Sequence, residues 1–255
     1  MNEFLGAILV IFASANVGFI VSLIKKRNDV ADIFWGIGFI VVAWTLFIFS
    51  QSFNFRSLIV NLLVTIWGLR LAFHISLRNH GKGEDFRYKA WRESWGKTFY
   101  WRSYLQVFIL QGLFLFLISL PIIFVNTRIA ELSLFDILGL IIWLIGFFFE
   151  AVGDYQLLQF TKNPANKGKI IQTGLWKYTR HPNYFGEVVL WWGIFCFALS
   201  VPFGFLTIIS PITITFLILY VSGIPMLEKK YENNPEFAEY KKRTSAFFPM
   251  LPKKL

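Results

Sequence analysis

Charged and amide side chains gather in residues 174–187, directly before and within an apolar stretch. Arg180 and His181 precede a proline that suits the first turn of a helix, whose exposed N–H groups favour a phosphate or carboxylate. Asn183 and Glu187 lie four residues apart and would hold ligand hydroxyl or amide groups from one helical face. A basic membrane anchor with a helix cap is the alternative. A glutamate inside an apolar span costs about 2.5 kcal/mol or more, which favours a functional site.

Two further acids, Glu150 and Asp154, lie four apart near the end of another apolar stretch. Carboxylates on one face of a membrane helix repel each other unless a cation or a hydrogen-bond donor lies between them. Lys162 and Arg180 are near in sequence to the same expected membrane boundary. We expect these acids to contact a cofactor, to form a structural salt bridge between two helices, or to do both.

A third group begins with Arg70, His74 and Arg78, spaced four residues apart on an expected helix. This cationic stripe suits a polyanionic cofactor better than simple packing. Arg87 and Tyr88 follow in the next polar segment. If that segment is helical, Glu84, Arg87 and Tyr88 share a face. Tyr88 is then a candidate acid or carbonyl donor, although an interfacial aromatic anchor is equally compatible with its position.

Asp32 stands in the first turn of the second expected helix, just before Ile33, Phe34 and Trp35. An acid there complements the helix dipole, which is a sufficient structural role. The functional interpretation is a carboxyl group beside an aromatic substrate pocket. We therefore name Asp32 and Tyr88 as candidate catalytic residues. No paired-cysteine or His-Glu-x-x-His metal site occurs in the sequence.

The elements that position these residues are membrane helices. Hydrophobic residues make up 56% of the 255-residue chain and charged residues 16%, against roughly 25% charged in soluble domains. We expect an all-α membrane protein that forms a single domain over 1–255 with about seven spans. Six spans plus a re-entrant pair is the alternative for the region of the last two spans. The expected spans are 4–24, 31–50, 57–77, 104–125, 134–158, 184–200 and 203–224.

The basic residues predict the orientation of these spans. All but three of the 25 Lys and Arg residues fall on one side when the connections alternate, the exceptions being Arg56, Arg70 and Arg128. The positive-inside rule then places the N-terminus outside and the C-terminus in the cytoplasm. The net charge of +10 is explained by contact with lipid headgroups, and we expect no nucleic-acid partner.

The motifs together resemble a known family. Asp154 and the run Arg180-His181-Pro182-Asn183-Tyr184-Phe185-Gly186-Glu187 are similar to the C-terminal domain of the steroid 5α-reductase superfamily. Residues 29–36 and 84–88 resemble its bacterial branch, DUF1295. The resemblance implies a seven-helix membrane reductase that binds NADPH through its C-terminal part, here 104–255, and reduces a C=C bond conjugated to a carbonyl. It adds Tyr178 and Tyr184 to the expected cofactor contacts.

The resemblance also leaves alternatives. The Arg-His-Pro-x-Tyr-x-Gly core is shared with isoprenylcysteine carboxyl methyltransferases, which bind S-adenosylmethionine. The steroid enzymes use a Glu on helix two and a Tyr on helix three, whereas here the corresponding helices offer Asp32 and Trp67. We expect an NADPH-dependent reductase of a steroid-like or polyprenoid substrate in a bacterial inner membrane. A methyltransferase and a non-enzymatic lipid-binding protein are the alternatives, and the sequence does not predict the oligomeric state.

Overall fold

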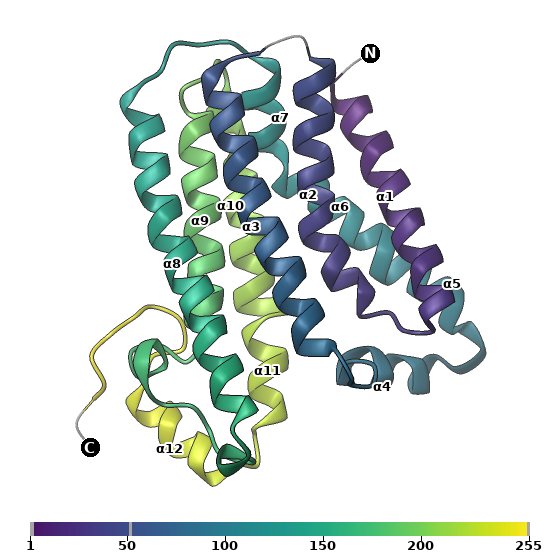
Figure 1. Cartoon of the computed structure of the whole chain (residues 1–255), viewed down its shortest axis with the longest axis vertical. Helices are drawn as coiled ribbons and strands as arrows, with labels where there is room; N and C mark the ends of the chain where they lie inside the picture. The colour runs from purple at the N-terminus through teal and green to yellow at the C-terminus, as the bar shows by residue number, and fades with distance from the viewer. Residues whose placement is uncertain (1–2, 51–52, 254–255) are drawn as a thin grey trace. The chain divides into compact units, whose positions relative to one another are not determined.

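The computed structural model of the chain describes residues 3–50 and 53–253 (Figure 1). Within these residues the structure is helical, and the isolated bridge between Thr179 and Ser245 is its only β-type pairing. The chain divides into two compact units, which we describe separately. The first comprises Met1–Leu132 with Phe197–Ser210, and the second Ser133–Cys196 with Pro211–Leu255.

In the first unit, α2 packs against both α1 and α3 (Figure 1). A short helix, α4, follows α3 after a loop and precedes the helical turns that lead into α6. The elements of this unit are α1 (Glu3–Lys25), α2 (Val30–Phe49), α3 (Phe55–Asn79), α4 (Phe86–Trp95), η1 (Gly96–Thr98), α5 (Phe99–Ser103), η2 (Tyr104–Ile109), α6 (Leu110–Ile118), α7 (Leu120–Thr127) and η5 (Gly204–Ile208).

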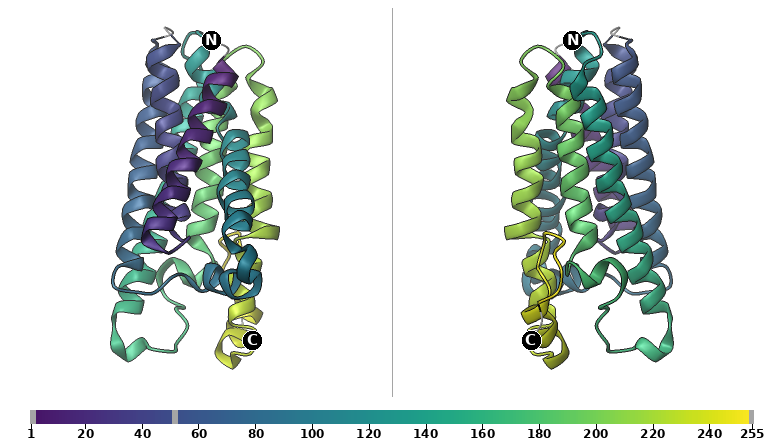
Figure 2. Two further views of the ribbon diagram at one scale, coloured as in Figure 1. Left: turned by 90° about the vertical axis from the view of Figure 1, so that its right-hand side faces the viewer. Right: turned by 90° about the vertical axis from the view of Figure 1, so that its left-hand side faces the viewer.

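In the second unit, α8 and α9 lie side by side, and the C-terminal segment returns to the loop that joins them (Figure 2, right). Its main elements are α8 (Leu134–Lys162), η3 (Pro164–Asn166), η4 (Gly174–Lys177), α9 (Pro182–Ala198), α10 (Ile209–Phe216), η6 (Leu217–Val221), α11 (Ile224–Lys230) and α12 (Pro235–Arg243).

Six helical segments of the described chain are long and apolar enough to cross a membrane. They correspond to six of the seven expected spans. The remaining one is α9, which has 17 residues and a length of about 25 Å at 1.5 Å per residue. A bilayer core of about 30 Å is longer than this helix. The structure thus supports a multi-pass membrane protein, while seven spans and the orientation of the termini stay predictions.

Two glycines bring the backbones of α2 and α3 together. A Cβ atom on Gly36 would lie 2.7 Å from the Gly68 carbonyl oxygen, and one on Gly68 would lie 2.6 Å from the Gly36 carbonyl oxygen. Any larger residue would therefore separate the helices. In a lipid environment, such small residues promote close van der Waals packing between helices.

A longer glycine series joins α8 and α9. Glycine recurs every seven residues on both helices, at positions 139, 146 and 153 of α8 and at 186 and 193 of α9. A Cβ atom on Gly186 would lie 2.3 Å from the Glu150 backbone nitrogen, and one on Gly146 would lie 2.3 Å from the Leu190 nitrogen. The contact is backbone against backbone, so side-chain rearrangement cannot relieve it.

The substitution Gly186→Ala tests this packing. Alanine favours the helical backbone by up to about 1 kcal/mol, yet its methyl group would overlap the α8 backbone and cost about 1–3 kcal/mol. We expect a lower unfolding temperature for the detergent-solubilised variant, measured by intrinsic fluorescence. Gly83→Ala is the control, because a Cβ there meets no atom within 4 Å. Equal unfolding temperatures for the two variants would contradict the close approach.

Candidate functional site

The two candidate catalytic residues meet at the start of α2. The Tyr88 hydroxyl donates to Asp32 Oδ1 over 2.7 Å, and Arg87 Nη2 donates to Asp32 Oδ2 over 2.7 Å. Tyr88 is 3% exposed, packed in a cluster with Val107 and Phe108. Both oxygens of one carboxylate are therefore engaged by residues that lie 55 and 56 positions further along the chain.

The loop before α4 positions Arg87 and Tyr88. Asp85 caps the helix by accepting from the Arg87 backbone nitrogen over 3.0 Å and also binds Arg87 Nε over 2.9 Å. Burial would raise the pKa of Asp85, but its hydrogen bond and charge interaction with Arg87 lower that pKa overall. The helix begins at Phe86, so Glu84 lies before it. Of the three residues expected on one helical face, only Arg87 and Tyr88 belong to the helix.

Asp29 fixes this loop to the turn between α1 and α2. It is 1% exposed and accepts from Arg27 through both oxygens, each over 2.6 Å. It also accepts from the Asn79 side chain over 3.3 Å and from the Asp85 backbone nitrogen over 3.2 Å. The pKa of Arg27 is raised, chiefly by its hydrogen bond to Asp29. The ends of three helices are thus joined at one carboxylate.

The cationic stripe follows α3 as expected. Arg70, His74 and Arg78 lie on one face of the helix and are half-buried. Arg78 Nε donates to the Asn79 side chain over 3.3 Å, which links the end of the stripe to Asp29. Within the first unit, the structure therefore places Arg78 near the acidic network. The role of all three in cofactor binding stays a prediction.

In the second unit, Asp154 on α8 pairs with Asn183 on α9. The Asn183 amide donates to Asp154 Oδ1 over 3.0 Å. Glu150, one helical turn earlier, is 2% exposed. The close approach of the two helices at Gly186 and Gly153 makes this pairing possible. Sequence spacing identified both acids, and the structure supplies Asn183 as the partner of one of them.

Arg180 and His181 meet an acid that sequence analysis did not select. Glu228 on α11 binds Arg180 Nη2 over 2.7 Å and His181 Nε2 over 3.1 Å, and Lys241 Nζ lies 3.0 Å from its second oxygen. Arg180 also donates to the backbone carbonyls of Thr244 and Lys241. The guanidinium is therefore already bound within the chain. The sequence feature that could have identified Glu228 is its position, because it is an acid at the end of an apolar span.

The C-terminal segment covers the loop before α9. Arg180 N donates to the Ser245 carbonyl over 2.9 Å, and Met250 N donates to the Tyr178 carbonyl over 2.9 Å. The Thr179 hydroxyl donates to the Phe247 carbonyl over 2.8 Å. These bonds hold residues 178–180 and 245–250 together, so the position of Arg180 depends on the C-terminal segment.

The remaining expected cofactor contacts lie around these residues. Tyr184 stacks against the His181 ring with centroids 5.7 Å apart. Glu187 lies one turn further along α9 and is half-buried, whereas Tyr178 and Lys162 are exposed. Lys162 ends α8. Their contacts with a cofactor stay predictions.

Two buried acceptors near the start of α9 have no hydrogen-bond partner among the described residues. They are Asn183 Oδ1 and His181 Nδ1. Burial lowers the pKa of His181, although the Glu228 carboxylate opposes that shift. The neutral ring then donates from Nε2 to Glu228, which leaves Nδ1 as an acceptor. Together the two atoms suit N–H or O–H groups of a ligand, such as an amide or a ribose hydroxyl.

The neutral state of His181 predicts a pH dependence. The unfolded chain binds a proton at this ring below about pH 6.5, whereas the folded chain resists it, so acid lowers the free energy of unfolding. We expect the unfolding temperature of the wild type to fall more between pH 7 and about pH 5 than that of His181→Asn. His80→Asn, at an exposed site, is the control and should follow the wild type. Parallel curves for all three proteins would argue against a buried neutral ring.

Comparison with known proteins places the chain in a family. An uncharacterized protein of Schizosaccharomyces pombe is 24% identical in an alignment that covers 98% of this chain and 80% of that protein. No solved structure matches the chain. The family model described as protein of unknown function (DUF1295) matches residues 18–244, a range that includes the Asp32–Tyr88 pair and the Asp154–Asn183 pair. The chain therefore belongs to the DUF1295 family.

Proposed function

We propose that this protein is a membrane enzyme that reduces a C=C bond conjugated to a carbonyl in a lipophilic substrate, with NADPH as the reductant. The hydrogen-bonded pair of Asp32 and Tyr88 carries this proposal. In the steroid 5α-reductase superfamily, which the sequence resembles, a Glu of helix two and a Tyr clamp the substrate carbonyl. Here an acid at the start of α2 is paired with a Tyr of α4 in place of helix three.

The chemistry requires a donor at the carbonyl oxygen. Addition of hydride to the β-carbon moves the electrons of the C=C bond toward that oxygen, and a proton from water is added at the α-carbon to complete the reduction. A carbonyl oxygen that takes the place of Asp32 Oδ1 would receive the Tyr88 hydrogen bond. Such a donor, held in a water-poor site, stabilises the developing negative charge. Arg87 would still balance the charge of the displaced Asp32 carboxylate through its other oxygen.

Residues of the second unit fit the amide and hydroxyl parts of a dinucleotide. Asn183 Oδ1 and His181 Nδ1 would accept from these groups, and Asp154 orients the Asn183 amide. NADPH, when bound, supplies the hydride. Arg180 is bound to Glu228, so its first role is to hold this loop. Its contact with a phosphate stays a prediction. Arg70, Arg78 and Arg87 likewise stay predicted phosphate contacts.

An S-adenosylmethionine-dependent methyltransferase is the second candidate. The observation in its favour is the engagement of Arg180 by Glu228, which leaves the motif with fewer cations for phosphates. S-adenosylmethionine carries no phosphate, and its sulfonium and amino groups would suit the buried acids Glu150 and Asp154. The Arg-His-Pro-x-Tyr-x-Gly core is compatible with either cofactor.

The site belongs to a membrane-embedded protein that contacts lipids along its apolar helices. A lipophilic substrate reaching Asp32 from the bilayer is consistent with this setting. We propose a bacterial inner membrane as the location, although a similar protein occurs in fission yeast. The proposal includes no nucleic-acid partner and makes no assignment of oligomeric state.

Ligand-induced thermal shifts and turnover test the proposed function. We expect NADPH, and not S-adenosylmethionine, to raise the unfolding temperature of the solubilised protein. Tyr88→Phe and Asp32→Asn should keep that shift yet lower reduction of a steroid enone probe by about 10²–10³-fold, because a donor to the oxyanion is lost or misplaced. Tyr155→Phe, at an exposed position, should match the wild type. Binding of S-adenosylmethionine without NADPH binding would overturn the reductase assignment.

A further inference from the structure

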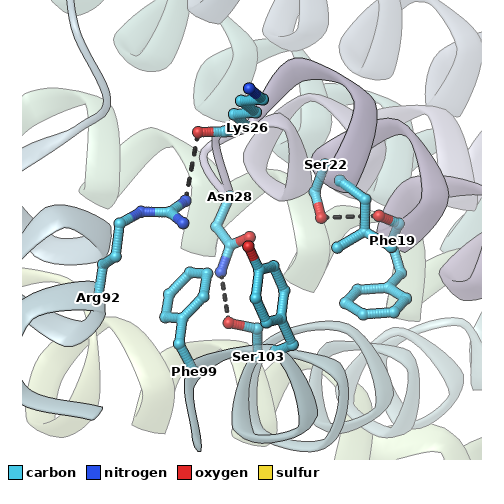
Figure 3. Close-up of a pocket in the computed structure, with 9 residues that line it drawn as sticks. Phe19, Ser22, Lys26, Asn28, Arg92, Phe99 and Ser103 are labelled. Carbon is cyan, nitrogen blue, oxygen red and sulfur yellow. Dashed lines mark hydrogen bonds between the residues drawn. The ribbon is translucent and has the colours of Figure 1, made fainter. Parts of the chain in front are cut away.

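A second site lies in the first unit, in a pocket between α1, the turn after it, α4 and α5 (Figure 3). Its volume is about 250 Å³. Ligand pockets for drug-sized molecules run from about 300 to 1,000 Å³, so this one is too small for a whole steroid or dinucleotide. It does match a small polar group. Figure 3 shows Arg92 on the left, Phe19 on the right, Asn28 and Ser103 between them, and the Lys26 side chain above Asn28 and directed away from it.

Asn28 and Ser103 give the pocket both a hydrogen-bond acceptor and a hydrogen-bond donor. Asn28 and Ser103 are 2% and 1% exposed, and the Asn28 amide donates to Ser103 Oγ over 2.8 Å. That bond uses Ser103 Oγ as an acceptor, so its hydroxyl hydrogen is available to a ligand. Asn28 Oδ1 is an acceptor available to a hydroxyl or ammonium group. A ligand with both an anionic oxygen and a polar hydrogen would complement this pair.

The charges that line the pocket favour a singly charged anion. Arg92 binds both oxygens of Glu84 over 2.9 Å, so its charge is balanced. Among the lining residues this leaves Lys26 uncompensated, since no acid of the described chain lies within ion-pair distance of its Nζ. Phe19, Leu23 and Phe99 supply apolar walls. A phosphodiester carries one negative charge, whereas a dinucleotide carries several.

Lys26 occupies an unusual backbone position. It has φ of 54° directly after α1, and the bonds from Arg27 N to the Ser22 carbonyl and from Lys26 N to the Leu23 carbonyl close the helix end. This helix-ending geometry normally takes glycine, because a side chain is disfavoured in the left-handed region. A lysine is disfavoured there relative to glycine, so a glycine at this position would not destabilise the turn. The Lys26 carbonyl meanwhile accepts from Arg92 Nη2 over 3.3 Å.

We propose that this pocket binds the phosphodiester headgroup of a membrane phospholipid. The exposed Lys26 side chain turns toward the pocket when the lipid binds, and its ammonium group and the Ser103 hydroxyl contact the phosphate oxygens. Asn28 Oδ1 accepts from the headgroup alcohol or amine, and the apolar walls contact the glycerol end. The site goes beyond the proposed reductase function and does not depend on it. It would hold one lipid at the junction of α1, α4 and α5.

Native mass spectrometry of the delipidated full-length protein tests this site. The protein is titrated with phosphatidylglycerol and, separately, with a diacylglycerol of the same chains. We expect the wild type to retain one phosphatidylglycerol and to bind the diacylglycerol at least tenfold more weakly. Lys26→Gly should weaken phosphatidylglycerol binding at least tenfold while leaving the lipid-free unfolding temperature unchanged or higher, because glycine suits this φ. Ser103→Ala should also weaken binding.

Lys25→Ala is the matched control, since it removes the same charge from the adjacent residue, which does not line the pocket. It should bind phosphatidylglycerol as the wild type does. Wild-type affinity in Lys26→Gly, or equal binding of the diacylglycerol, would overturn the proposal. Displacement of the lipid by an equal concentration of inorganic phosphate would assign the pocket to a soluble anion instead.

Discussion

A carboxylate cannot be buried beside apolar helices unless cations or donors bind it, and this constraint organises the first unit. The start of α2 carries Asp29 and Asp32, and each receives a guanidinium, from Arg27 and Arg87 respectively. Satisfying both acids brings the α1–α2 turn, the end of α3 and the start of α4 together. The same contacts place the Tyr88 hydroxyl on Asp32. The proposed catalytic pair is thus part of the interaction that fixes the helix ends.

The second unit is organised by close backbone packing. Glycines allow α8 and α9 to touch, and the contact brings Asp154 to Asn183. The loop between these helices is then secured from outside by Glu228 and the C-terminal segment. Arg180 serves this attachment, while the buried acceptors of His181 and Asn183 have no hydrogen-bond partner among the described residues. The basic motif at Arg180 and His181, which the sequence suggests is a phosphate site, therefore also holds this loop to α11 and the C-terminal segment.

The sequence predicts most of the fold, because long apolar runs must form helices in a bilayer. It also identified the apolar stretch at 184–200, which the structure shows as helix α9, while a membrane crossing by this helix stays a prediction. It selected Asp32 and Tyr88 separately but could not pair them, since their contact depends on how residues 80–85 return to the α1–α2 turn. Glu228 was missed for the same reason, because its partners lie 47 and 48 residues away. Local periodicity carries no information on such long-range polar contacts.

Asp32 and Tyr88 form one hydrogen-bonded unit, on which the proposed site depends. A double-mutant cycle of Asp32→Asn, Tyr88→Phe and the double variant measures this directly, through the free energy of unfolding in detergent. We predict a coupling energy of about 1–3 kcal/mol, typical of a buried hydrogen bond to a charged group. Additive effects, with a coupling energy near zero, would contradict the pairing and the account of the site built on it.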